Sequence, residues 1–211
     1  MTKYFISKIQ GYDIVGFDID GTIYDEFDFI KQAYVGVAKV ISDYAKADEK
    51  EVYIELCNQW KQFGSSKTTL FQDVFGVFST EKAEPDLIKL CVEAFRNQPI
   101  ELELSNTAKV IFDYLMENNI ERYIVTDGNS DLQRKKISAL GLSKWFNESK
   151  IAISGDYGKE FQKPSPFMAQ QILSINANAK KLYFGDRDVD MNFAKNINSD
   201  FIRVNNWSIC V

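Results

Sequence analysis

The stretch YDIVGFDIDGT (residues 12–22) joins a short apolar run to a pair of carboxylates. Residues 12–17 are rich in β-branched and aromatic side chains, which is typical of a strand buried in a parallel sheet. Asp18 and Asp20 follow at once, and then a glycine turn at Gly21. In open α/β sheets ligands bind beyond the carboxyl ends of the strands, so this strand places two acids where a ligand would bind. Taken alone, the same residues also fit an ordinary strand-to-turn exit, because Asp and Gly both favour turns.

A long helical region follows this first strand. Apolar residues recur there in steps of three and four, as on the buried face of an amphipathic helix: Ile30, Tyr34, Val37, Ile41 and Tyr44. This region is much longer than a simple βαβ crossover needs. We therefore predict a small α-helical domain at residues 24–99, inserted into a core formed by residues 1–23 and 100–211. Its aromatic stripes are interpreted as its own hydrophobic core rather than as a cofactor site.

Beyond the insert, helical and strand-like stretches alternate. We predict further buried strands at residues 122–126, 150–154, 181–185 and 201–204, with amphipathic helices between them. Pro164 is expected in the first turn of one of these helices. Strands separated by helices of this length indicate an α/β fold with a Rossmann-like, doubly wound parallel sheet. The pattern of residues 1–11 leaves a strand, a helix and an irregular segment equally open.

Composition excludes several classes of function. The net charge of −5 and the pI near 5.0 argue against a nucleic-acid-binding surface. No apolar run reaches the length of a membrane span, and the first ten residues lack the apolar core of a signal peptide. The cysteines at 57, 91 and 210 are scattered and have no metal-ligand spacing, so we expect reduced thiols and a cytoplasmic protein. The oligomeric state, monomer or homodimer, stays open.

The chain contains no histidine. This excludes Ser-His-Asp and Cys-His catalytic systems as well as zinc sites built on histidine. A general acid or base in this protein must therefore be a carboxylate, Lys, Tyr or Cys.

Polar residues follow the strands that we expect near the centre of the sheet. Asp18 and Asp20 follow the first strand, Thr126 ends the second, and Asp186 and Asp190 follow the fourth. A lysine, at position 163, follows the third. Because the carboxyl ends of parallel strands meet at one edge, these side chains are expected to share a crevice. Each also has an ordinary explanation as a helix cap, a turn residue or a surface charge, but a shared site explains all of them together.

Four carboxylates in one crevice need a counter-charge, because each raises the cost of ionising the others. One lysine is too little, and a hard divalent cation such as Mg²⁺ suits a few carboxylates and water. A cation, a lysine, a hydroxyl and backbone N–H groups together can bind a phosphate group. One carboxylate could then attack phosphorus while another handles the proton.

The stretches FDIDGT (17–22), IVTDGN (124–129), KPSP (163–166) and FGDRDVDM (184–191) resemble, in this order, the motifs of the haloacid dehalogenase superfamily. The resemblance extends over residues 12–205, and is greatest to phosphatase-like members with a helical cap after the first strand. It implies an aspartyl-phosphate mechanism. By this resemblance Asp18 would be the nucleophile and Asp20 the general acid/base. The phosphate group would be bound by Thr126, Asp127 and Lys163. The Mg²⁺ ligands would be Asp18, Asp186 and the backbone carbonyl of Asp20, and the site would be supported by Asp190 and Gly21. The dehalogenases of the superfamily lack an acid two residues after the nucleophile, so Asp20 favours phosphoryl chemistry.

The resemblance leaves more than one function open. We expect a Mg²⁺-dependent phosphatase that hydrolyses a small phosphorylated metabolite, with no nucleic-acid partner and no membrane association. A sugar-phosphate phosphotransferase or mutase is the first alternative, because it uses the same core. Phosphonate hydrolysis would need a cap lysine as Schiff-base amine, and Lys39, Lys46, Lys61 and Lys67 keep it open. A non-catalytic binding protein is much less favoured than a phosphatase, because no motif residue is lost. A dehydrogenase is weaker still, because Gly155 and Gly158 follow a strand without the glycine pattern of a dinucleotide turn.

Overall fold

The computed structural model describes residues 2–173, 179–205 and 208–209. It divides into two compact units, residues 1–26 with 102–211 and residues 27–101. The domain boundaries that we predicted, at residues 23/24 and 99/100, fall close to these divisions.

The larger unit contains a six-stranded sheet in the order β3-β2-β1-β4-β5-β6. Strand β1 (Ile14–Phe17) is central, with β2 (Glu121–Thr126) on one side and β4 (Lys181–Gly185) on the other. The strands β3 (Ile151–Ile153) and β5 (Asp200–Asn205) continue the sheet in parallel. The predicted doubly wound parallel sheet is therefore confirmed. Strand β6 (Ser208–Ile209), which we did not predict, pairs with β5 in the antiparallel direction.

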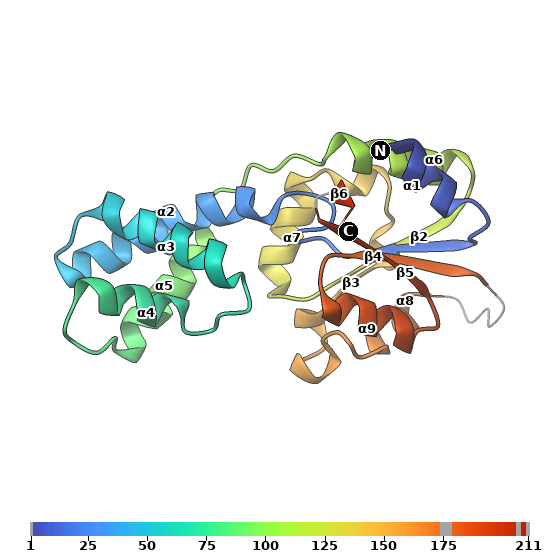
Figure 1. Cartoon of the computed structure of the whole chain (residues 1–211). Helices are drawn as coiled ribbons and strands as arrows, with labels where there is room; N and C mark the ends of the chain where they lie inside the picture. The colour runs from blue at the N-terminus through green and yellow to red at the C-terminus, as the bar shows by residue number, and fades with distance from the viewer. Residues whose placement is uncertain (1, 174–178, 206–207, 210–211) are drawn as a thin grey trace. The chain divides into compact units, whose positions relative to one another are not determined.

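Helices cover both faces of this sheet, with α1 and α6 on one face and α8 and α9 on the other (Figure 1). The helices of this unit are α1 (Thr2–Ile9), α6 (Asn106–Glu117), α7 (Ser130–Ala139), α8 (Phe167–Ile172) and α9 (Asp188–Asn196). Short 3-10 turns lie at Leu142–Lys144, Glu148–Lys150, Ser154–Asp156 and Lys159–Phe161.

The side chains of β1 alternate between two cores. Phe17 packs on one face, edge-on to Phe112 of α6 and stacked on Phe184 of β4, with ring centroids 5.0 and 5.3 Å apart. Ile14 belongs to the core on the other face, with Tyr123, Tyr183 and other buried side chains. A strand buried on both sides needs apolar residues at every position, which explains the unbroken apolar run.

The chain start, which the sequence left open, forms helix α1. Its Phe5 and Ile9 are spaced by one helical turn, and both are completely buried. The Phe5 ring packs edge-on to Phe184 of β4, 6.1 Å between centroids. Burial of these two side chains against the sheet therefore stabilises a helix that is too short to form alone.

One predicted helix start was wrong. We expected Pro164 in the first turn of a helix, but α8 begins at Phe167, with Pro166 as its N-cap residue. The backbone N–H of Lys163 donates to the carboxylate of Asp127, and that of Ser165 donates to the carbonyl of Gln162. These bonds hold the residues before Phe167 in a turn.

The smaller unit is helical throughout, as predicted for the insert. It consists of α2 (Glu26–Ala45, mostly within this unit), α3 (Glu49–Phe63), α4 (Leu70–Phe78) and α5 (Pro85–Asn97). Asp48 caps α3 by accepting from the backbone N–H of Glu51. Cys57 and Cys91 are buried free thiols here, and Cys210 lies outside the described residues. Among the helices that the structure describes, none is long and apolar enough to cross a membrane.

Gly16 of β1 gives a test of the core. A Cβ atom at this position would come within 2.2 Å of Tyr123 Cζ, and Tyr123 is itself fully buried. We expect Gly16→Ala to lower the free energy of unfolding by about 1–3 kcal/mol, because a rigid ring cannot move aside in a packed core. Urea denaturation followed by circular dichroism measures the change.

Gly76→Ala is the matched control, because a Cβ at this exposed position in α4 meets nothing within 4 Å. Alanine there should stabilise the helix by about 0.5–1 kcal/mol. Equal stabilities for the wild type and Gly16→Ala would contradict the packing described for β1.

Candidate active site

The site lies where β1, β2 and β4 end. Asp18 directly follows β1, Thr126 is the last residue of β2, and Asp186 directly follows β4. The backbone N–H of Asp18 donates to the carbonyl of Phe184 (2.9 Å), so the first residue after β1 is still tied to β4. Asp18 and Thr126 are each only 1% exposed. The parallel sheet thus brings together residues that are far apart in the sequence.

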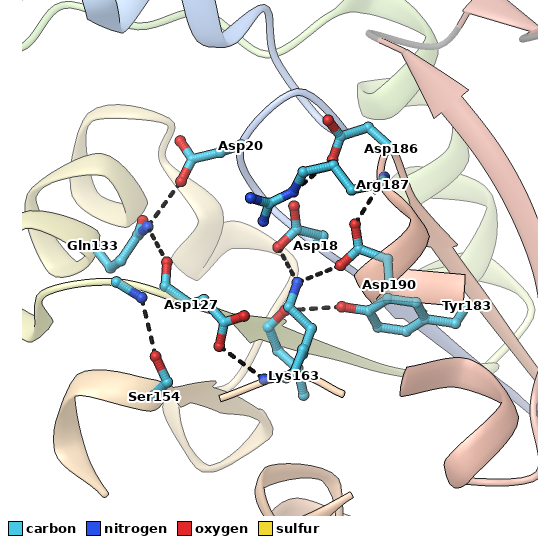
Figure 2. Close-up of polar contacts among 12 residues, drawn as sticks. Asp18, Asp20, Asp127, Gln133, Ser154, Lys163, Tyr183, Asp186, Arg187 and Asp190 are labelled. Atoms are coloured by element: carbon cyan, nitrogen blue, oxygen red, sulfur yellow. Dashed lines mark hydrogen bonds and ion pairs between the residues drawn. The ribbon is translucent and has the colours of Figure 1, made fainter. Parts of the chain in front are cut away.

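Lys163 joins two carboxylates inside this site (Figure 2). Its Nζ atom donates to Asp18 Oδ1 at 2.6 Å and to Asp190 Oδ1 at 2.5 Å, and all three side chains are buried. Burial lowers the pKa of the Lys163 ammonium, but the charges of Asp18 and Asp190 outweigh it and raise the pKa above its ordinary value. Lys163 is therefore a cation held between two acids.

The two carboxylates bound by Lys163 differ in their surroundings. Burial raises the pKa of Asp18 well above its ordinary value; Lys163 opposes this shift, and Asp190 and Asp186 add to it. Burial also acts to raise the pKa of Asp190, but Lys163 and the backbone N–H of Arg187 outweigh it, so its pKa is lowered. Asp190 Oδ2 accepts from that N–H at 3.0 Å, at the start of α9. Asp190 thus caps a helix and belongs to the site as well.

Three carboxylates could hold a metal ion. Asp18, Asp186 and Asp190 each place an oxygen within 4.8 Å of the others. Asp18 Oδ2 and Asp186 Oδ1 are buried and have no hydrogen-bond partner among the described residues. Such atoms are costly to bury unless something binds them. A divalent cation with oxygen ligands therefore fits this donor set.

Asp186 is affected by the charges around it. Burial raises the pKa of Asp186 to about 6; Arg187 opposes the shift, with its Nε atom 3.8 Å from Asp186 Oδ1, and Asp190 adds to it. Gly21 faces this carboxylate, because a Cβ there would lie 2.6 Å from Asp186 Oδ2. The positive φ of Gly21 (73°) also favours glycine. Only a residue without a side chain lets the turn after β1 pass this close to Asp186.

Asp20 is held in a second cluster. Its Oδ2 accepts from Gln133 Nε2 at 2.8 Å, and its Oδ1 accepts from Lys136 Nζ at 2.6 Å and from the Tyr24 hydroxyl. Burial raises the pKa of Asp20, but the charge of Lys136 and the three hydrogen bonds outweigh it, and the net pKa is lowered. The Asp20 side chain is therefore outside the group formed by Asp18, Asp186 and Asp190.

The loop after β2 carries the predicted phosphate-binding residues. The Thr126 hydroxyl is buried and has no hydrogen-bond partner in the described parts of the chain. The Ser154 hydroxyl accepts from the backbone N–H of Gly128 at 3.0 Å, and Asn129 caps α7 through Leu132. The carboxylate of Asp127 accepts from the backbone N–H of Lys163 (3.2 Å). Hydrogen bonds to Ser154 and Lys163 thus hold the loop in place, while the hydroxyl group of Thr126 forms no hydrogen bond in the described structure.

Sequence reasoning missed several residues of this site: Tyr24, Gln133, Lys136, Ser154 and Arg187. A signal for two of them was present. Gln133 and Lys136 are three residues apart and lie on the buried side of α7 with Leu132, where polar residues are unusual. Figure 2 shows that the Arg187 side chain lies beside Asp186 and Asp18. Arg187 directly follows the motif residue Asp186, but no pattern in the sequence indicated that its side chain points into the site.

Comparison with solved structures shows relatives of the same fold. A candidate phosphatase from Clostridium difficile is 22% identical, with a TM-score of 0.69 over 95% of this chain and 88% of that one. A candidate β-phosphoglucomutase from Thermotoga maritima is 16% identical, with a TM-score of 0.64 over 90% and 84% of the two chains. The candidate HAD-hydrolase YfnB from Bacillus subtilis, solved with bound magnesium, is 20% identical, with a TM-score of 0.58 over 92% and 89%.

At these identities the similarity shows the fold and not the substrate. No curated protein matches the sequence. The family model of the haloacid dehalogenase-like hydrolases matches residues 15–204, which is most of the chain. The match spans the ends of β1, β2 and β4, where Asp18, Thr126 and Asp186 lie. The protein therefore belongs to the haloacid dehalogenase-like hydrolase family.

Proposed function

We propose that this protein is a Mg²⁺-dependent phosphomonoesterase that acts on a small phosphorylated metabolite through an aspartyl-phosphate intermediate. One observation carries the proposal: three buried polar atoms in one site have no hydrogen-bond partner among the described residues. They are Asp18 Oδ2, Asp186 Oδ1 and Thr126 Oγ1. Two are carboxylate oxygens suited to a cation, and the third is a hydroxyl suited to a phosphoryl oxygen.

The donor set indicates which residues would hold Mg²⁺. Asp18 and Asp186 each offer an oxygen that accepts no hydrogen bond, and the backbone carbonyl of Asp20 would complete the protein ligands. Asp190 uses one oxygen for Lys163 and the other for the backbone of Arg187, so it would mainly steady the site. When bound, Mg²⁺ supplies positive charge that offsets the charge of the phosphate oxygens.

In the first half-reaction the Asp18 carboxylate attacks phosphorus. A bond forms between its oxygen and phosphorus, the bond from phosphorus to the leaving oxygen breaks, and Asp20, which enters this step in its protonated form, gives that oxygen its proton. In the second half-reaction a water attacks the phosphorus and gives a proton to Asp20. The bond from phosphorus to Asp18 then breaks, which releases inorganic phosphate and restores both carboxyl groups.

Lys163 and Thr126 bind the transferring phosphoryl group in this proposal. An ammonium has three N–H donors, and Lys163 uses two of them for Asp18 and Asp190. The third can donate to a phosphoryl oxygen beside the nucleophile. The Thr126 hydroxyl can donate to another. Both groups favour the transition state, in which charge is spread over the phosphoryl oxygens.

The lysines of the helical unit give no support to phosphonate hydrolysis. Lys39, Lys46 and Lys61 are exposed. Lys67 lines a pocket of this unit, but its ammonium pairs with Asp73 at 2.8 Å, which favours the charged form over the free amine. A Schiff-base lysine is normally desolvated in a pocket. The helical unit would instead act as the cap that selects the substrate.

The first test is phosphate release from a panel of phosphorylated metabolites and from p-nitrophenyl phosphate. We expect wild-type turnover that EDTA abolishes and Mg²⁺ restores. Asp18→Asn should lower kcat by at least about a thousandfold, because it removes the nucleophile. Asp43→Asn, at an exposed position of α2, is the control and should keep wild-type activity.

Inactivity of the wild type on the whole panel in the presence of Mg²⁺ would contradict the proposal. Transfer of phosphate within a sugar phosphate, without release, would indicate a mutase instead.

Magnesium binding can be tested without activity. We expect Mg²⁺ to raise the thermal midpoint of the wild type, because it binds the folded state only. Asp186→Asn should remove most of this shift, since it takes away the charge of one carboxylate ligand whose oxygen accepts no hydrogen bond. Differential scanning calorimetry in EDTA and in Mg²⁺ measures both. An equal Mg²⁺ shift in wild type and variant would exclude Asp186 as a ligand.

Lys163→Met tests the buried cation. Its loss leaves Asp18 and Asp190 without their shared partner, so we expect the free energy of unfolding to fall by about 3–5 kcal/mol. The value of kcat/KM should fall at least about a hundredfold. Lys144→Met removes an exposed pair with Asp113 (3.3 Å) and should cost less than about 1 kcal/mol. Similar losses in the two variants, measured by urea denaturation, would show that burial does not set the strength of the Lys163 pair.

A further inference from the structure

Two buried lysines hold the two aspartates of the first motif separately. Lys163 binds Asp18, and Lys136 binds Asp20, each at 2.6 Å. Figure 2 shows the Asp20 carboxylate turned toward Gln133 of α7 and the Asp18 carboxylate turned toward Lys163. The two carboxylates are thus held in different directions by different parts of the chain.

The donors around Asp20 are unusual for their positions. Gln133 and Lys136 are each only 3% exposed, and both lie on α7. Burying a lysine is costly unless it is paired, and here its partner is Asp20. Tyr24 is 1% exposed and donates its hydroxyl to the same carboxylate. A helix face that carries a glutamine and a lysine toward one carboxylate is difficult to explain by core packing alone.

Gln133 also connects Asp20 to the phosphate-binding loop. Its Nε2 atom donates to Asp20 Oδ2 (2.8 Å) and to the backbone carbonyl of Asp127 (2.9 Å). Asp127 is the residue after Thr126, whose hydroxyl would bind the phosphoryl group. The position of the acid/base is therefore tied to the position of the group on which it would act.

We propose that Lys136, together with Gln133 and Tyr24, is a positioning residue that fixes the Asp20 carboxylate for proton transfer. The inference rests on the proposed phosphatase function and names residues that this function does not include. Donors to both oxygens leave the carboxylate one orientation, facing α7 and apart from Asp18. Without these donors, the Asp20 side chain could rotate toward Lys163 and the proposed Mg²⁺ site. There its carboxylate would compete with that of Asp18 for both cations.

The proposal has consequences for each half-reaction. Protonation of the leaving oxygen matters most for a poor leaving group such as phenoxide, and less for nitrophenoxide, which leaves readily without a proton. Activation of water in the second half-reaction is needed for every substrate. Because positioned general acid–base catalysis is worth about a hundredfold to ten-thousandfold, its partial loss should be visible in kcat. Binding of the phosphate group, by Thr126 and Lys163, should not change.

The experiment compares Lys136→Met with Lys135→Met, its exposed neighbour in α7. We expect Lys136→Met to lower kcat on p-nitrophenyl phosphate about tenfold to a hundredfold and to lower KM with it, because slow breakdown lets the aspartyl-phosphate accumulate. On phenyl phosphate kcat should fall further. Rapid mixing should reveal a burst of about one nitrophenolate per enzyme, because the aspartyl-phosphate forms but breaks down slowly. Lys135→Met should behave like the wild type, and Lys136→Arg should recover part of kcat.

Two smaller changes keep the test valid if Lys136→Met fails to fold, which the thermal midpoint would show. Tyr24→Phe and Gln133→Leu each remove one donor to Asp20, and each should show the same burst and the same stronger loss on phenyl phosphate. Folded variants with wild-type kcat, or with a raised KM and an unchanged kcat, would overturn the positioning role. A wild type that hydrolyses neither ester would instead overturn the proposed function, so the two failures are distinguishable.

Discussion

The site depends on one buried ammonium, that of Lys163. It lies between Asp18, which follows the central strand, and Asp190, in the first turn of α9. Without this cation two buried carboxylates would face each other, and at least one would have to take up a proton. Asp186 has one oxygen without a hydrogen-bond partner in the described structure, although Arg187 Nε lies 3.8 Å from it, and burial raises the pKa of Asp186 to about 6. The site is therefore short of positive charge, which is the condition under which a metal ion binds.

The sheet makes this arrangement possible. Parallel strands β1, β2 and β4 end at the same edge, and their residues pair in register, so Phe17 lies between Ile124 and Phe184. Small residues then let the polar groups approach. Gly185 is an example, because a Cβ there would lie 2.4 Å from the Cβ of Asp190. Backbone geometry thus controls the distances between charges, and the charges in turn are tolerated only because of their partners.

The two aspartates of the first motif are in different environments although only one residue separates them. Burial raises the pKa of Asp18 well above its ordinary value, whereas the donors around Asp20 lower its pKa below the ordinary value. Such separation of two carboxyl groups by their surroundings is a general means of giving each a different chemical role. Here it results from the burial of Asp18, which outweighs the opposing charge of Lys163, and from Lys136 and the other donors around Asp20.

The sequence by itself determined the sheet, the place of the insert and the motif residues. Unbroken apolar runs such as residues 14–17 indicate strands buried on both faces, and Asp18, Thr126 and Asp186 follow such runs directly. Those signals are local, and the parallel topology follows from the alternation with helices. The helix at the chain start could not be read in the same way, because burial of Phe5 and Ile9 against the sheet stabilises it. Only the tertiary structure decided the partners of each charge: Lys136 and Gln133 are more than a hundred residues from Asp20, and nothing near Asp20 in the sequence indicates them. The physical reason is that a hydrogen bond depends on where two side chains meet, and that is set by how α7 packs on the core.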